Sequence, residues 1–482
     1  MTTLALVGTI MTGCSSNDNI IGDEQHVTPD NIVTVTATVG LNNSGTMTVP
    51  TAMALNDGGT TRALNIDYDK KEAKKTFAEG EQVALVYTNT SDEEKKSVAT
   101  AENISADGKS ASFTFTLVNP KNDQTVFYYY PAALVNESAK LEIPIENQNG
   151  TLANVESLDY AYNTGYLSGT TLSPSVSLEN KFSIVAFTLK DATGDNDITS
   201  TITGMNISDG INNNITVNRT AAAGPIYVIM RAVYERDLSI TATDGIRNYT
   251  KSLSDKTYAA NNFYQQGLRM IPQSMTLNLS TLSKNFTAQN GDVLTGTLNV
   301  ESHPVNVSIA DGAMVTLNDV TINGMNSSSY RWAGINCLGN ATIILSGTNT
   351  VKGFLENYPG IHVLSGNTLT IQGDGSLTVS SNGHGAGIGG GLNIACGNIN
   401  IVGGTITATG GYASAGIGGG NGSVCGNITI TNGVTKVTAT KGENAANSIG
   451  AGGNDGTVGT VTIGGNVGVI TDSPYTYQPQ IQ

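Results

Sequence analysis

Acidic and histidine side chains are scattered through the C-terminal part of the chain, where catalysis on a repeated scaffold would need them paired. Polysaccharide lyases and glycoside hydrolases place several carboxylates on neighbouring strands, for acid–base work or for calcium. The acidic residues between positions 310 and 470 are Asp311, Asp319, Glu356, Asp374, Glu443 and Asp455. No two of them share a repeat position, and His362 and His384 have no matched carboxylate. We therefore expect no enzyme, with a polysaccharide lyase or glycoside hydrolase as the alternative.

Three cysteines occupy one position of the repeat, shortly before a Gly-Asn phrase: Cys337, Cys396 and Cys425. On stacked strands they would form a ladder of small apolar side chains about 4.8 Å apart. A disulfide between Cys396 and Cys425 is the alternative, although in-register parallel strands would hold it poorly. Zinc would need converging ligands that include a histidine or a fourth cysteine. We predict neither a metal site nor a cofactor.

Aromatic side chains are the candidate ligand contacts, because sugars stack on such rings. The candidates in the C-terminal part are Tyr330, Trp332, Tyr358 and Tyr412. Trp332 is the only tryptophan, and it ends a Ser-rich loop, which favours exposure. Alternatively, it covers the open end of a stack of repeats. The sequence predicts a surface that binds glycans.

A repeat must position these residues. Its isoleucines are 26, 27, 29 and 32 residues apart and are Ile335, Ile361, Ile388, Ile417 and Ile449. A period in this range indicates a solenoid, since one unit buries its apolar face only against its neighbours. The unit from Gly387 to Ala415 reads as three short strands with glycine corners. Asparagines recur at one corner, as Asn340, Asn367, Asn398 and Asn427, and we expect them to form a structural ladder. The pattern resembles right-handed parallel β-helix proteins of the carbohydrate-binding and pectate-lyase-like kind.

Composition supports an all-β protein of several domains. The 482 residues include 57 glycines, only 13% are charged, and Val/Ile/Thr-rich runs alternate with Gly, Asn and Asp. The net charge of −15 argues against nucleic acid as a partner, because phosphate binding needs clustered Lys and Arg.

The N-terminus carries a short apolar run, from Leu4 to Met11, that ends at Thr12-Gly13-Cys14. It is too short to span a bilayer. It resembles a bacterial lipobox, which implies lipidation of Cys14 and an outer-membrane lipoprotein exposed at the cell surface.

The front half, about residues 20–272, resembles the fimbrillin-like proteins of Bacteroides-type bacteria. The segments that carry the resemblance are Thr61-Arg62-Ala63, Phe77–Val83, Tyr128–Pro131, Ile143–Gln148, Phe182–Leu189 and the Tyr-rich stretch from Tyr258 to Tyr264. The resemblance implies two transthyretin-like β-sandwiches. It also implies protease trimming at Arg62 and strand addition between subunits.

The expected domains are a signal and tether (1–30), sandwich 1 (31–160), sandwich 2 (161–272) and the β-helix (291–482). In sandwich 1 we expect strands at Gln82–Thr88, Ser110–Val118 and Lys140–Ile145. The charged run Ser91–Lys96 is expected to be a loop or a short helix. The expected function is that of an adhesin or a fimbrial tip or accessory subunit, with glycans or other fimbrial subunits as partners. A structural shaft subunit is a further alternative.

Overall fold

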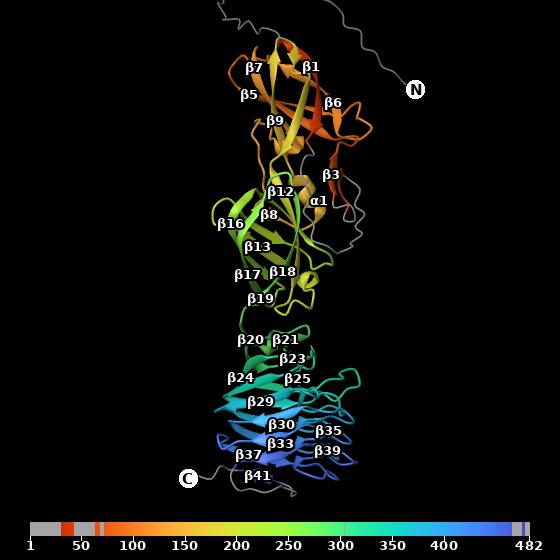
Figure 1. Ribbon diagram of the computed structural model, residues 1–482, viewed down its shortest axis with the longest axis vertical. Helices are drawn as coiled ribbons and strands as arrows, with labels where there is room; N and C mark the ends of the chain where they lie inside the picture. Colours follow the sequence, from red (N-terminus) through yellow and green to blue (C-terminus); the bar gives the residue numbers. More distant parts are fainter. Residues whose placement is uncertain (1–29, 43–62, 68–71, 303, 465–474, 478–482) are drawn as a thin grey trace, which may run out of the picture. The chain divides into compact units, whose positions relative to one another are not determined.

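The computed structural model describes residues 30–42, 63–67, 72–302, 304–464 and 475–477 (Figure 1). The protein is all-β, and the one α-helix among these residues is α1 (Leu152–Leu158). No helix in the described part is long and apolar enough to cross a membrane. The chain divides into two compact units. Unit 1 comprises Met1–Leu189, Asp197–Ile240 and Ser252–Leu268, and unit 2 comprises Lys190–Asn196, Thr241–Lys251 and Arg269–Gln482.

The first sheet of unit 1 surrounds an apolar core that is rich in aromatic side chains. Its strand order is β5 (Glu94–Thr100), β4 (Gln82–Thr88), β7 (Gln124–Tyr130), β9 (Ala161–Ser168), β11 (Ser175–Asn180), β1 (Ile32–Leu41) and β6 (Ser110–Val118). Alternate residues of β1 and β6 are buried, as the two-residue period of a strand requires. Phe113, Phe115 and Tyr128 are fully buried in the core that this sheet encloses.

Two strand predictions in this sheet were wrong. Part of the charged run Ser91–Lys96 belongs to strand β5, which lies at the sheet edge, where charged side chains reach water. Lys140–Ile145 forms only an isolated bridge, between Leu141 and Val135. It contains Pro144, which has no N–H to donate to a ladder. The sheet also extends past the expected boundary at residue 160, because β9 and β11 belong to it.

A second core lies farther along unit 1. Strand β12 (Phe182–Lys190) lies between β15 (Ile226–Arg231) and β18 (Phe263–Arg269). The other sheet of this region contains β8 (Asn147–Gln148), β14 (Asn214–Asn218), β13 (Gly204–Ser208), β16 (Val233–Thr243) and β17 (Asn248–Tyr258). Helix α1 buries Val155 and Leu158 against Phe182 and Ile184. The Thr151 hydroxyl caps the helix by accepting from the Asn154 N–H at 3.2 Å.

Unit 2 is built from turns of chain stacked on one another, and each turn adds one strand to each of three rows. Row 1 contains β22 (Val293–Thr297), β24 (Ala313–Asn323), β26 (Ala341–Ser346), β29 (Thr368–Gly373), β32 (Asn398–Ile401), β36 (Ile428–Ile430) and β40 (Val461–Ile463). Row 2 begins with the last residues of the long strand β24, which pair with β27. Its strands are then β27 (Thr348–Lys352), β30 (Ser376–Ser380), β33 (Thr405–Thr409), β37 (Lys436–Thr440) and β41 (Tyr475–Tyr477). Row 3 contains β21 (Phe286–Ala288), β23 (Val307–Ile309), β25 (Ile335–Cys337), β28 (Ile361–Val363), β31 (Ile388–Gly389), β34 (Ile417–Gly418) and β38 (Ile449–Gly450). Neighbours within each row are parallel, except that β41 runs antiparallel to β37.

The repeated isoleucines stack in register, as their spacing predicts. In row 3, Ile335 pairs with Ile361, Ile361 with Ile388, Ile388 with Ile417, and Ile417 with Ile449. All five are at most 1% exposed. A second column in row 1 consists of Ile343, Ile371, Ile401, Ile430 and Ile463. These columns line one continuous apolar core.

A buried ion pair fixes the first turn of unit 2. Arg247 is 3% exposed and Asp292 is fully buried, and the guanidinium contacts both carboxylate oxygens. Asp292 also accepts the backbone N–H groups of Met275 at 3.0 Å and Gln289 at 2.7 Å. Arg247 donates a further hydrogen bond to the Gln273 carbonyl at 2.9 Å. The pair is thus almost completely hydrogen-bonded, which is the condition for burying two charges at low cost.

Candidate binding surface

Loops that follow the row 2 strands stack into a projecting column. We define the loop column as residues 353–360, 381–387, 410–416 and 441–448. Backbone hydrogen bonds join successive loops: His384 donates to the Glu356 carbonyl at 2.6 Å, and Tyr412 donates to the Gly383 carbonyl at 2.7 Å. Ala413 donates to the Glu443 carbonyl at 2.7 Å. The column therefore repeats with the same period as the strands.

Glycine is required where these loops touch. A Cβ atom on Gly411 would lie 1.7 Å from the Gly383 carbonyl oxygen, and one on Gly442 would lie 1.7 Å from the Gly411 carbonyl oxygen. Real Cβ atoms do not approach so closely. The glycine-rich sequence thus brings the loops into direct backbone contact and sets the spacing of the side chains beside them.

One exposed aromatic ring stands in this column, surrounded by polar groups. Tyr412 is 46% exposed, and its ring lies edge-on to the His384 ring, with 5.6 Å between the centroids. The Asn444 amide donates to the Tyr412 hydroxyl at 2.8 Å. The Asn421 amide nitrogen lies 3.3 Å from His384 Nδ1, and the Asn454 amide donates to the Asn421 side-chain oxygen at 2.7 Å. We call these five residues the Tyr412 cluster.

The Tyr412 cluster combines an aromatic face with amide donors and acceptors. Its members come from successive turns of the stack, so the backbone holds their separations. Within the described residues, no group of three or more His, Cys, Asp or Glu side chains is placed to hold a metal ion. The chemistry that this cluster offers is ring stacking together with neutral hydrogen bonding.

The other aromatic candidates lie elsewhere or are less exposed. Tyr358 is half-buried in the first loop of the column, where its carbonyl accepts the Ser381 hydroxyl at 2.9 Å. Tyr330 and Trp332 are also half-buried and pack against the fully buried Phe354, with ring centroids 6.2 and 5.6 Å from it. The rings of Tyr330 and Trp332 pack on the apolar core, whereas Ser328, Ser329 and Arg331 of the same loop are exposed. Tyr412 was one of the candidates named from the sequence, and its role as a ligand contact stays a prediction. The amides around it were missed, because they come from different turns.

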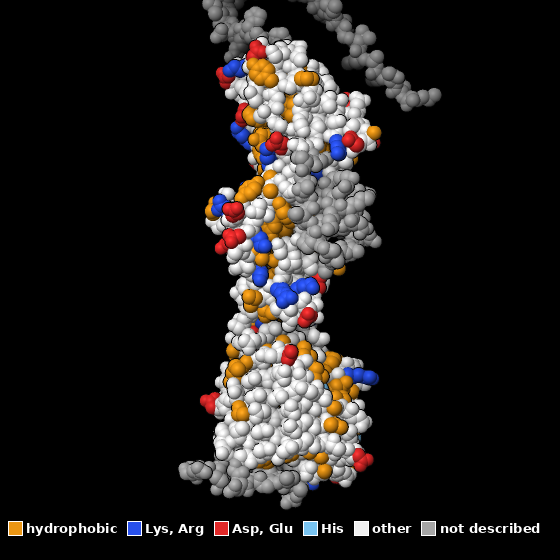
Figure 2. Space-filling view, in the orientation of Figure 1, with side chains coloured by type: hydrophobic (Ala, Val, Ile, Leu, Met, Phe, Trp, Pro, Cys, Tyr) orange, Lys and Arg blue, Asp and Glu red, His pale blue; other side chains and the backbone are white. Residues whose placement is uncertain are grey.

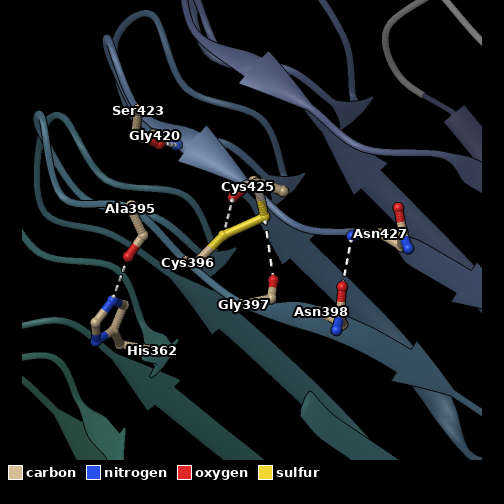
Figure 3. The surroundings of a disulfide bond; sticks show 10 residues. His362, Ala395, Cys396, Gly397, Asn398, Gly420, Ser423, Cys425 and Asn427 are labelled. Carbon is tan, nitrogen blue, oxygen red and sulfur yellow. Dashed lines mark hydrogen bonds between the residues drawn. A yellow bond between two sulfur atoms is a disulfide. The ribbon is translucent and has the colours of Figure 1, made fainter. Parts of the chain in front are cut away.

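The cysteine column contains a disulfide, which sequence reasoning had ranked below a simple ladder. Cys396 and Cys425 are bonded across adjacent turns, with their Cα atoms 4.6 Å apart (Figure 3). Cys396 lies outside any strand, so the geometry of in-register strands does not constrain it. Cys337 is buried and free. It pairs in register with Val363, so an intervening turn separates it from Cys396. Burial raises the pKa of the Cys337 thiol to about 12.

The asparagine ladder is real at three of its four expected positions. Asn398 accepts the Asn427 N–H at 2.8 Å through its side-chain oxygen, as Figure 3 shows, and Asn427 accepts the Thr460 N–H at 2.8 Å. Asn340 accepts the Thr368 N–H at 3.0 Å. Thr368, and not Asn367, stands at the ladder position, because it pairs in register with Asn398. The expectation for Asn367 is therefore corrected by one residue.

Two predicted sites cannot be placed. Cys14, the expected lipidation site, and Arg62, the expected processing site, lie outside the described residues.

No family model matches the sequence, and no curated protein matches it either. Several solved structures are similar to the chain. They include a putative cell adhesion protein from Bacteroides fragilis (11% identity, 49% of this chain and 92% of that chain, TM-score 0.29), the tip fimbrial protein Mfa3 from Porphyromonas gingivalis (11%, 51% and 97%, 0.25) and a fimbrial assembly protein from Parabacteroides distasonis (10%, 49% and 90%, 0.25).

Proposed function

We propose that the chain is a cell-surface adhesion protein. In this proposal unit 2 is a parallel β-helix that presents the Tyr412 cluster to glycans. The main support for this proposal is the exposed Tyr412 ring, which contacts His384 and Asn444 from the neighbouring turns. A rigid stack that holds an aromatic face beside amide groups is suited to a sugar ring and its hydroxyl groups.

The members of the Tyr412 cluster carry no carboxylate or amine, although the exposed Glu443 precedes Asn444. On the face seen in Figure 2, most of unit 2 is neutral side chain or backbone, with few charged groups. Stacking and neutral hydrogen bonds would then supply the affinity, and binding would depend only weakly on salt.

The disulfide supports a location outside the cytoplasm. Disulfides persist in oxidising compartments such as the periplasm and the cell surface. The Cys396–Cys425 bond fits this location, as does the proposed lipid anchor at Cys14. In the same proposal, unit 1 contains two transthyretin-like sandwiches that space the β-helix from the membrane or join fimbrial subunits. The mass of the mature protein from membranes tests the lipid on Cys14 and cleavage after Arg62 together.

A glycan array probed with the full-length chain tests the binding proposal. We expect specific array signals that are lost in Tyr412→Ala and kept in Tyr166→Ala. Tyr166 is the matched control, because it is 48% exposed but lies in unit 1. The absence of any signal, or equal signals from Tyr412→Ala and wild type, would contradict the proposal.

A further inference from the structure

A cavity of about 670 Å³ opens in unit 1, far along the chain from the Tyr412 cluster. Its walls come from residues 149–152, Thr203, residues 218–220 and 222–225, and Tyr227. The volume falls within the range of about 300–1,000 Å³ that is typical of small-molecule sites. The cavity therefore has room for a ligand the size of one or two sugar rings.

Among the described residues that line this cavity, Arg219 is the only one with a charged side chain. Its Nη2 donates to the Ala222 carbonyl at 2.7 Å. Its Nη1 is buried and has no hydrogen-bond partner among the residues that the structure describes. Burial lowers the pKa of the Arg219 guanidinium. Arg219 as a whole is only half-buried, so the rest of its guanidinium can pair with an anionic acceptor in the cavity.

The surrounding backbone holds Arg219 in place. Its own N–H donates to the Thr203 carbonyl at 2.9 Å. Its stem passes over Gly150, where a Cβ atom would come within 3.6 Å of Arg219 Cδ and 3.1 Å of a Val217 methyl group. Gly150 has a φ of +76°, a conformation that also favours glycine. The hydrogen bond from Nη2 to the Ala222 carbonyl limits where the guanidinium can lie, which lowers the entropic cost of binding.

The remaining wall suits a ring with hydroxyl groups. Asn218 and Thr220 are exposed at its edge, whereas Tyr227 is only 6% exposed and forms part of the floor. Amide and hydroxyl side chains can exchange hydrogen bonds with sugar hydroxyls. We propose that this cavity binds an acidic saccharide, in which the carboxylate of a uronic acid pairs with Arg219 and the ring lies over Tyr227. Arginine is well matched to a carboxylate in geometry and charge.

Titration of the full-length chain by NMR or calorimetry tests this site with three probes: glucuronate, glucose and acetate. Glucose keeps the ring without the carboxylate, and acetate keeps the carboxylate without the ring. We expect glucuronate to bind more tightly than either, and its Kd to rise at least about tenfold in Arg219→Gln. The matched control is Arg236→Gln, which removes an equal charge from unit 1 outside the cavity and should leave the Kd unchanged.

A second variant keeps the test independent of any folding defect in Arg219→Gln. Ala223→Phe adds bulk at an exposed position in the cavity wall and should weaken glucuronate binding while the thermal melt stays the same. Equal affinity for glucose and glucuronate, or for acetate and glucuronate, would overturn the proposal, as would the absence of glucuronate binding. Tyr412→Ala should not affect this titration, so failure here is distinct from failure of the adhesion proposal.

Discussion

Shortening Ile388 to alanine tests whether the row 3 isoleucine column stabilises unit 2. Ile388 is fully buried and lies in register between Ile361 and Ile417. Large-to-small substitutions of buried isoleucine cost about 2–5 kcal/mol, and the cost rises when the site cannot collapse. Parallel strands lie directly on both sides, so we expect a loss of free energy of unfolding in the upper half of that range, about 3–5 kcal/mol.

The assay uses the single tryptophan of the chain. Trp332 lies in unit 2 and packs against its core, so its fluorescence during urea denaturation reports on that unit. Far-UV circular dichroism, recorded in parallel, reports on the turns farther from Trp332. Because each turn contacts mainly its neighbours, Ile388→Ala should also release the later turns before the earlier ones.

The matched control is Ile394→Ala. Ile394 is only half-buried, in the loop between β31 and β32, and we expect its truncation to cost less than about 1 kcal/mol. Equal losses for the two variants, or an unchanged transition by both probes for Ile388→Ala, would refute the buried column.

Three further perturbations follow from the structure. Cys396→Ser/Cys425→Ser should lower the free energy of unfolding by about 3–4 kcal/mol, since the bond closes a loop with a sequence separation of 29; urea denaturation measures this. Gly411→Ala should cost about 1–3 kcal/mol in the same assay, because its Cβ would meet a carbonyl oxygen at 1.7 Å. Burial lowers the pKa of His362, so the folded protein favours the neutral ring. The contribution of His362 to the free energy of unfolding should be complete above its usual pKa of about 6.5 and should be lost as the pH falls below that value. In His362→Gln, the free energy of unfolding should therefore decrease less as the pH falls.

Each of these perturbations has a control. A reducing agent should destabilise the wild type as much as the double serine variant is destabilised, and should leave that variant unaffected. Gly267→Ala should change the thermal melt little, because a Cβ there meets nothing within 4 Å. A Gly411→Ala protein as stable as Gly267→Ala would contradict the stacked loops. If the free energy of unfolding of His362→Gln changes with pH as it does in the wild type, the His362 ring does not contribute to that dependence.

The sequence predicted the parts of unit 2 that depend on repetition. The spacing of the isoleucines was enough to anticipate the column around Ile388, because only stacking in register places the same residue at the same depth in each turn. The asparagine ladder was predicted less exactly. The prediction aligned Gly366-Asn367 with the other Gly-Asn pairs. In the structure, the register is one residue later in this turn, so Thr368 and not Asn367 occupies the ladder position.

Other features depend on contacts that no local pattern encodes. The amides of Asn421 and Asn444 reach the Tyr412 cluster from separate loops, and Arg219 meets its cavity only because β14 lies near Gly150. Trp332 was expected to be exposed because it ends a Ser-rich loop, but contact with Phe354 draws its ring onto the core and leaves it half-buried. In each case, tertiary packing decides which side chains meet and which are buried.

Strand β41 runs against the direction of every other strand in its row. It lies antiparallel on β37, with Thr476 in register with Thr438. A parallel row exposes unpaired N–H and C=O groups along its last strand, which invite pairing with a further chain. Along the β41 register, the reversed strand occupies those groups on β37, so a neighbouring molecule cannot extend the row there by repeating its pattern. Row 2 thus ends on a reversed strand of only three residues, and a very short edge strand is one of the features that limit pairing with a further chain.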